Sequence, residues 1–312
     1  MTIIVNKVYL IVLLVLLVLF SLLAFLPFGS SANPVAVMRT MDAGHAFAFI
    51  LLSAVLYLAV EPYGKWRAVI TSSVLSVLLM VVVELVQPYV GRTASFADIQ
   101  EGLLGVVLAL SGMIVWRCQS RRLLKIAHLL LLLLSLAWVV NPALSEWRAL
   151  WLREQQFPVL GSFDADLEKR LWMAHGKGTV VSFSDRHVIT GESSLKIKTS
   201  GDTWSGIRYA AGDQDWRGYE SLSLDIYNTG LPFLLSIRID DGVSHSPDYG
   251  DRFDGRFLIA TGANTLLIPL DVIAAGPKSR LLALDKIRKV ILFLSKEETQ
   301  RVFYLDNVHL GP

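Results

Sequence analysis

The sequence contains almost no cysteine, because Cys118 is the only one among its 312 residues. A disulfide within the chain is therefore excluded, and so is a zinc site built from several thiolates. The chain also lacks a large excess of positive charge: its formal net charge is +2, and it has no long run rich in lysine and arginine. We set nucleic-acid binding aside, since it depends on a basic surface.

The first half of the chain has few charged residues. Residues 8–38 contain none, and residues 8–28 are mostly leucine, valine, isoleucine and phenylalanine. About 20 such residues cross the hydrocarbon core of a bilayer, so this segment is predicted to be a transmembrane helix. A cleaved signal peptide is the alternative, because Ser30-Ser31-Ala32 resembles a cleavage site. The apolar run is longer than that of an ordinary signal, which favours the helix.

Further apolar segments follow at residues 43–60, 68–89, 99–116 and 123–140. The sequence thus predicts an all-α bundle of about five transmembrane helices within residues 1–141. An odd number of spans places the two ends of the bundle on opposite sides of the membrane. The positive-inside rule then puts the N-terminus in the cytoplasm and the second half of the chain outside. This orientation gathers on the inner side Lys7, Lys65, Arg67, Arg117, Arg121, Arg122 and Lys125.

Six polar or charged residues lie within or beside these spans: Asp42, His45, Glu84, Gln87, Arg92 and Asp98. The first two are three residues apart, as are the next two, so each pair shares one face of its helix. Asp98 stands at the predicted start of the fourth span, where a carboxylate suits the helix N-terminus. Gly102 and Gly105 come after it, and glycines in a span allow a neighbouring helix to approach closely.

The order and spacing of these residues resemble the motif series of VanZ-like membrane proteins over about residues 10–116. The matching motifs are Asp42-x-x-His45, Glu84-x-x-Gln87, Gly91-Arg92-Thr93 and Asp98 followed by Gly105. Two positions depart from the pattern, since Gly102 stands where the family usually has asparagine and Ala109 where it has glycine. The resemblance implies a protein of the bacterial cell envelope, in a family associated with low-level teicoplanin resistance. The fifth span would be an addition that exports the second half of the chain.

Ionisable residues inside a membrane are costly and usually functional. We expect Arg92 to clamp a phosphate or carboxylate of a lipid headgroup, with Asp42, Gln87 and Asp98 as further lipid- or anion-binding residues. His45 or Glu84 would be the catalytic group that moves a proton.

Three other interpretations remain. The polar residues could only fix the packing of helix ends. Asp42, His45 and Glu84 could hold a divalent metal, although no known ligand spacing supports it. Ser95 could act in a hydrolase, although no motif surrounds it.

In the second half of the chain, apolar residues recur at every second position in several short segments. After a predicted interfacial linker at residues 142–160, polar and apolar residues alternate in short runs separated by turns, such as residues 195–198, 222–226, 235–240 and 302–306. This pattern predicts an all-β jelly-roll sandwich over residues 161–312.

The region resembles the galactose-binding-like jelly-roll domains that accompany polysaccharide-handling proteins. The resemblance rests on Phe163-Asp164, the run from Thr190 to Ile197, the run from Asp215 to Tyr219 and the closing run from Phe303 to Val308. It implies a carbohydrate-binding site, with the candidates Trp204, Tyr209, Arg238, Asp240, His245, Tyr249, Asp251 and Arg252. Trp216 and Tyr219 are expected in the core instead. It also implies a structural calcium held by Asp164 and Asp306.

These observations predict a multi-pass protein of the bacterial cytoplasmic membrane with an extracytoplasmic sandwich. It would recognise a lipid-linked or wall glycan, and a further hypothesis is that it also processes this glycan chemically. The alternative is a non-enzymatic anchor whose sandwich binds a polysaccharide or a protein partner.

Overall fold

The computed structural model describes residues 11, 15, 33–90, 96–117, 121–201, 204–243, 248–295 and 299–312. The predicted first span at residues 8–28 therefore lies almost entirely outside the described residues, as do Arg92, Ser95 and His245. Contacts divide the chain into two compact units, Met1–Glu146 and Trp147–Pro312.

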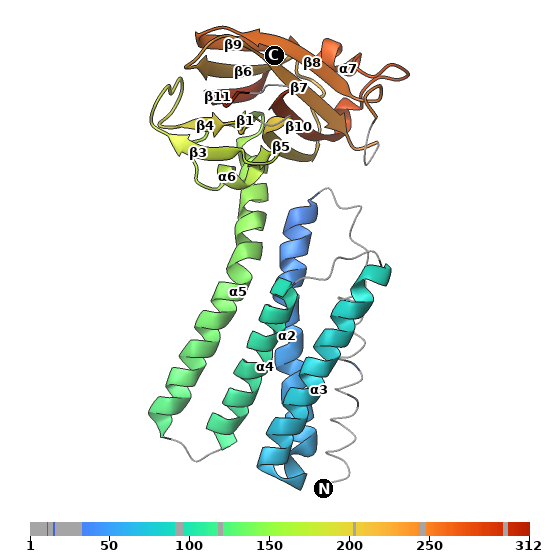
Figure 1. Ribbon diagram of the computed structural model, residues 1–312, viewed down its shortest axis with the longest axis vertical. Helices are drawn as coiled ribbons and strands as arrows, with labels where there is room; N and C mark the ends of the chain where they lie inside the picture. Colours follow the sequence, from blue (N-terminus) through green and yellow to red (C-terminus); the bar gives the residue numbers. More distant parts are fainter. Residues whose placement is uncertain are drawn as a thin grey trace. The chain divides into compact units, whose positions relative to one another are not determined.

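The first unit is helical (Figure 1). Its long helices are α2 (Pro34–Val60), α3 (Lys65–Val86), α4 (Phe96–Arg117) and α5 (Arg122–Gln156), with the short 3-10 helices η1 (Glu61–Tyr63) and η2 (Gln87–Val90). Each of these four long helices is long and apolar enough to cross a membrane. They correspond to the last four of the five predicted spans, and α2 begins nine residues before the predicted residue 43.

Apolar side chains lie on the outside of this unit as well as between its helices. On α3, Ile70, Val74 and Leu78 are all more than half exposed, which suits a surface that faces lipid. Between the helices, Gly102 and Gly105 of α4 allow the close approach that their spacing predicts. A Cβ atom at Gly105 would come within 2.4 Å of the Ala46 carbonyl oxygen on α2, so the backbones pack with no space for a side chain.

Helix α5 continues through the segment predicted to be an interfacial linker and ends at Gln156. Pro142 lies inside it, where the missing N–H removes one backbone hydrogen bond. Ala149 and Arg153 near its end are buried in the second unit, and Arg153 Nη1 donates to the Ala210 carbonyl at 3.2 Å. The end of α5 is thus part of the core that the sandwich forms.

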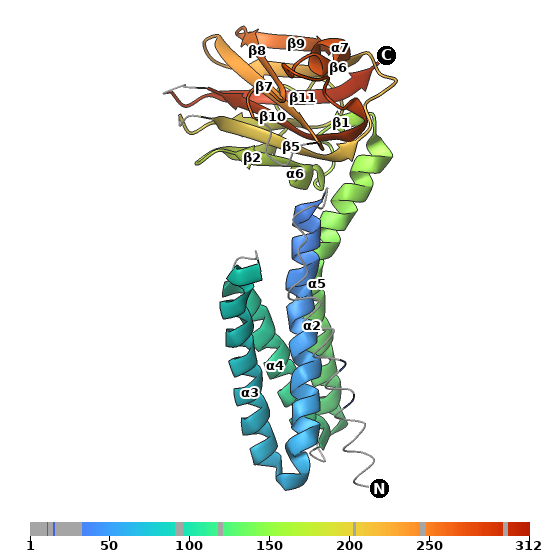
Figure 2. The same cartoon turned by 90° about the vertical axis from the view of Figure 1, so that its right-hand side faces the viewer.

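The second unit is an antiparallel β-sandwich, as the alternating pattern predicted. The six-stranded sheet has the order β3-β4-β11-β6-β9, with β1 paired to β11; its strands are β1 (Val159–Gly161), β3 (Val180–Ser184), β4 (Ser194–Lys198), β6 (Ser221–Asn228), β9 (Gly262–Pro269) and β11 (Val302–Gly311). The five-stranded sheet has the order β2-β5-β10-β7-β8 (Figure 2); its strands are β2 (Trp172–His175), β5 (Ser205–Gln214), β7 (Phe233–Asp241), β8 (Phe253–Ile259) and β10 (Ile287–Leu294).

Short helices α6 (Glu168–Leu171), α7 (Leu270–Ala274) and η3 (Leu284–Lys286) connect strands. Alternate residues of each strand point to opposite faces, and on β5 the inward set is Ile207, Tyr209 and Ala211, all fully buried. Trp216 is also fully buried and Tyr219 packs against the same core, which confirms the core positions predicted for both.

Candidate functional sites

The outer face of the five-stranded sheet gathers side chains from strands that are distant in sequence. The strand register aligns His175, Gly206, Phe293, Ser236 and Arg256 in one row across β2, β5, β10, β7 and β8. The next row holds Met173, Arg208, Ile291, Arg238 and Asp254. We call the surface formed by these two rows, together with Trp204 beside them, the outer face.

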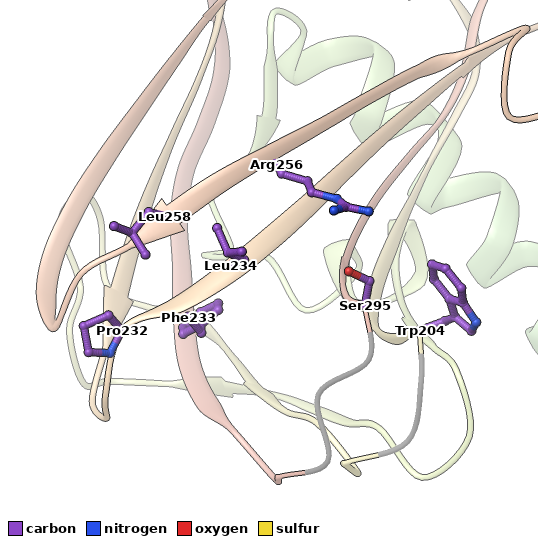
Figure 3. Close-up of a pocket in the computed structure, with 7 residues that line it drawn as sticks. All are labelled: Trp204, Pro232, Phe233, Leu234, Arg256, Leu258 and Ser295. Atoms are coloured by element: carbon purple, nitrogen blue, oxygen red, sulfur yellow. The ribbon is translucent and has the colours of Figure 1, made fainter.

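Two adjoining depressions on this surface share Trp204. The larger has a volume of about 410 Å³ and is lined by Trp204, Pro232, Phe233, Leu234, Arg256, Leu258 and Ser295. Figure 3 shows that Arg256 extends its guanidinium toward the side that Trp204 and Ser295 form. The smaller, of about 220 Å³, is lined by His175, Trp204, Arg238, Arg252, Ile291 and Phe293. Both depressions combine aromatic or apolar surface with arginine, which suits a ligand that has apolar and charged parts.

Trp204 links the two depressions and is held in an unusual conformation. Its side chain is 52% exposed, and its ring centroid lies 5.5 Å from that of Phe293. Its backbone has φ +68°, a left-handed conformation that costs a non-glycine residue about 1–3 kcal/mol. The backbone N–H donates to the Leu294 carbonyl at 3.0 Å. The conformation thus fixes an exposed indole at the edge of the sheet.

Some arginines on or beside the outer face are paired. Arg238 donates two hydrogen bonds to Asp240, at 2.6 and 2.7 Å, and Arg252 Nε donates to Asp254 at 2.7 Å. The Arg252 guanidinium also lies 5.5 Å from the ring centroid of Tyr249. Arg238 and Asp240 share the polar face of β7, since Ile237 and Ile239 are fully buried on the other side.

The other arginine side chains of this surface, those of Arg208 and Arg256, form no hydrogen bond or ion pair with the part of the chain that the structure describes. Among the described residues on and beside the outer face, positive charges outnumber negative ones, with Asp240 and Asp254 set against Arg208, Arg238, Arg252, Arg256 and Lys289. Burial lowers the pKa of His175, and the positive charges of Arg208, Arg238 and Lys289 lower it further. His175 is thus neutral at pH 7 and adds no charge.

Of the predicted sugar-binding residues, Tyr209 lies in the core and Asp251 forms an ion pair with a neighbouring loop. Tyr209 is fully buried against Trp172, at a ring-centroid distance of 4.9 Å, so the expectation of an exposed ring is wrong. Its position in the alternation of β5 explains this, because Arg208 occupies the outward position beside it. Asp251 accepts a hydrogen bond from Arg280 Nε at 2.6 Å, which ties it to a neighbouring loop.

His175, Arg208, Arg256 and Phe293 are among the members of the outer face that the sequence reasoning missed. Each stands at an outward position of its strand, so the alternation of polar and apolar residues could have shown that it points away from the core. The alternation does not show which strands pair, however, and these residues meet only through the order β2-β5-β10-β7-β8.

Asp164 and Asp306, the predicted calcium ligands, both hold the loop before β4. Asp306 Oδ2 accepts from the backbone N–H groups of Ile189 and Thr190, at 2.6 and 3.0 Å. Asp164 Oδ1 accepts from those of Glu192 and Ser193, at 2.6 and 3.0 Å. Burial raises the pKa of Asp306, and its repulsion with Asp164 adds to the rise. A cation between the two carboxylates would relieve that repulsion, so calcium stays a prediction.

The helical unit brings three of its predicted polar residues together. His45 on α2, Glu84 on α3 and Asp98 on α4 are each at most 6% exposed, and one ligand atom of each lies within 4.8 Å of the others. Glu84 is in the last turn of α3 and Asp98 in the first turn of α4. We call these three residues the buried trio.

The remaining predicted residues of this unit lie around the trio's helices. Asp42 forms an ion pair with Arg39 at 3.5 Å, one turn before His45. Gln87 is fully buried, and its side-chain nitrogen and oxygen make no hydrogen bond with the described residues. Glu101, which the sequence reasoning missed, lies one turn after Asp98 on the same face of α4, and its spacing of three repeats that of the other pairs.

No protein-family model matches this chain, and no curated protein does, so membership of the VanZ-like family stays a prediction. The β-sandwich is similar to solved carbohydrate-binding modules. One is the family 11 module from Clostridium thermocellum in complex with a β-1,3-1,4-mixed-linked tetrasaccharide, with 22% identity, coverage of 49% of this chain and 94% of that one, and a TM-score of 0.39. Another is the CBM22-1 xylan-binding domain from Paenibacillus barcinonensis, with 14% identity, coverage of 49% and 93%, and a TM-score of 0.36.

Proposed function

We propose that this chain is a membrane-anchored glycan-binding protein whose outer face binds an acidic polysaccharide or glycan. The observation that carries the proposal is the exposed indole of Trp204 in one depression with the Arg256 guanidinium, which has no partner among the described residues. A planar indole offers an apolar surface to the C–H face of a sugar ring. A guanidinium binds a carboxylate or phosphate with two parallel hydrogen bonds.

The positive charge of the outer face favours an acidic ligand over a neutral one. Arg208 and Arg256 come from β5 and β8, with β10 and β7 between them, so two anionic groups spaced along one glycan could each meet an arginine. Salt screens such contacts between exposed charges. Binding should therefore weaken as ionic strength rises.

The helical unit supplies the anchor in this proposal, since four of its helices are long and apolar enough to cross a membrane. We place the protein in the bacterial cytoplasmic membrane with the sandwich outside, from the distribution of lysine and arginine. A lipid-linked glycan would then be a ligand for the sandwich, and Arg92 remains the residue that the sequence predicts to bind the anionic anchor of such a glycan. Alkaline phosphatase fused after Gln156 should be active, and an inactive fusion would overturn this orientation.

The binding test uses the full chain in detergent with two probes, polygalacturonate and a neutral β-glucan. Trp204→Gly removes the indole and suits φ +68°, and Arg256→Gln removes the charge. Arg256→Gln should weaken polygalacturonate binding at least about tenfold, because one charge-assisted hydrogen bond contributes ~1.5–3 kcal/mol. Trp204→Gly should also weaken it, because the apolar surface for the sugar ring is lost. Leu267→Ala is the matched control, since Leu267 is 66% exposed on β9 of the other sheet.

Two outcomes would decide against the proposal. If both variants bind as the wild type does, the outer face is not the binding surface. If the folded wild type binds neither probe, the alternative of a non-enzymatic anchor that binds a protein partner is favoured. Equal affinity for both probes would keep the sugar-stacking role of Trp204 and remove the preference for acidic ligands.

A further inference from the structure

We propose that His45, Glu84 and Asp98 bind a divalent transition-metal ion within the helical unit. The three residues come from three different helices, yet one ligand atom of each lies within 4.8 Å of the others. Two ligands that share an ion at about 2.1 Å lie no more than about 4.2 Å apart. Small side-chain rotations are therefore enough to close the site.

The hydrogen bond of His45 prepares the imidazole to act as a ligand. His45 Nδ1 lies 3.1 Å from the Met41 carbonyl oxygen, which can only accept, so Nδ1 carries the proton. In the neutral ring the lone pair is then on Nε2. Metal-binding histidines commonly donate their other ring N–H to a backbone carbonyl in this way, which fixes the tautomer and the ring orientation.

Charge is the second reason to expect a cation. Glu84 and Asp98 are buried carboxylates in an apolar helical unit, and two negative charges close together there repel each other at a high cost. A divalent cation would be attracted by both carboxylates and would replace their mutual repulsion with attraction.

Gln87 provides an independent observation. Its side chain is fully buried, and Gln87 is the C-cap residue of α3, three positions after Glu84. Neither its amide nitrogen nor its amide oxygen has a hydrogen-bond partner among the described residues, and a buried amide without partners is costly. A water bound to the ion would give this amide a partner, because three protein ligands leave a coordination position open.

The ligand types select the class of ion. Imidazole suits zinc and other transition metals, whereas magnesium and calcium prefer sites made only of oxygen atoms. We therefore expect Zn²⁺ and Co²⁺ to bind more tightly than Mg²⁺ or Ca²⁺.

The test uses the full chain, purified in detergent and stripped with a chelator before ZnCl₂ is added. One zinc ion per chain should be retained after desalting, and the melting temperature should rise by several degrees. Glu84→Gln and Asp98→Asn should lose both effects. His128→Gln is the matched control, because His128 is a buried histidine of α5 outside the trio and should keep both.

The opposite results are equally clear. If the folded wild type retains no zinc, or if Glu84→Gln retains as much zinc as the wild type with the same affinity, the metal site does not exist. If a variant fails to fold, X-ray absorption of zinc on the wild type still decides: one imidazole with oxygen ligands supports the site, and the absence of imidazole rejects it.

Discussion

Gly105 of α4 packs so closely against Ala46 of α2 that an added Cβ would lie 2.4 Å from the Ala46 carbonyl oxygen. The contact is next to His45 in sequence and two turns beyond Asp98, so it holds together the helices that carry two members of the buried trio. Gly105→Ala should therefore separate α2 from α4. We expect a lower melting temperature of the detergent-solubilised chain and weaker zinc retention.

Gly44 offers a control on the partner helix. Nothing lies within 4 Å of a Cβ added there, and alanine is favoured over glycine inside a helix by roughly 0.5–1 kcal/mol. Gly44→Ala should leave the melting temperature unchanged or raise it. A Gly105→Ala variant as stable as Gly44→Ala would contradict the close packing of the two helices.

The boundary of the sandwich can be tested with two fragments. Residues 147–312 include the end of α5, where Ala149 is 1% exposed, and strand β1, which pairs with β11. The shorter fragment, residues 161–312, begins at the boundary that the sequence alone predicts. It lacks the end of α5 and nearly all of β1. We expect the longer fragment to unfold cooperatively in urea and the shorter one to have a lower midpoint. Equal midpoints would show that the end of α5 adds no stability.

Glu168 should make the stability of the sandwich depend on pH. Its side chain is fully buried and accepts hydrogen bonds from Ser162 N, Ser162 Oγ and Phe163 N at 3.0, 2.7 and 2.9 Å. Burial raises the pKa of Glu168 above 4.5, although these hydrogen bonds oppose the rise. Its contribution to stability is therefore fully present below pH 4.5 and is lost as pH rises through the folded-state pKa.

Glu168→Gln does not titrate, so the difference in unfolding free energy between wild type and this variant isolates the carboxyl group. The unfolding free energy of the wild type, relative to that of Glu168→Gln, should be highest at low pH and should fall as pH rises. Urea unfolding of residues 147–312 measures this difference. Asp215→Asn is the control: hydrogen bonds from Arg217 hold the pKa of Asp215 at about 2 in the folded chain, against an ordinary value of 3.8, so the stability difference for this variant is constant above about pH 6. A pH-independent difference for Glu168→Gln would refute the raised pKa.

Calcium at Asp164 and Asp306 predicts a chelator-sensitive sandwich. Chelation should lower the melting temperature of residues 147–312, and added CaCl₂ should restore it. Asp306→Ala should be less stable from the outset, because it loses the acceptor for Ile189 and Thr190 N–H groups, and it should no longer respond to chelator. If chelator does not change the melting temperature of the wild type, the calcium prediction is wrong, although the contacts of Asp164 and Asp306 with the loop still stand.

The sequence by itself determined the kind of each element. Runs of about 20 apolar residues can lower their free energy only as membrane helices, and a period of two can bury one face only in a sheet. The spacing of three also determined that Glu84 and Gln87 share a helix face. These are local properties, since each depends on residues within a few positions of one another.

The tertiary structure decided which residues meet. Alternation places Tyr209 and Arg208 on opposite faces of β5, but only the packing of the second sheet makes the tyrosine side the core. Phe293 reaches Trp204 because β10 pairs with β5, and Asp98 reaches His45 and Glu84 because Gly105 lets α4 approach α2. Such contacts join residues far apart in the chain, where no local pattern constrains their distance.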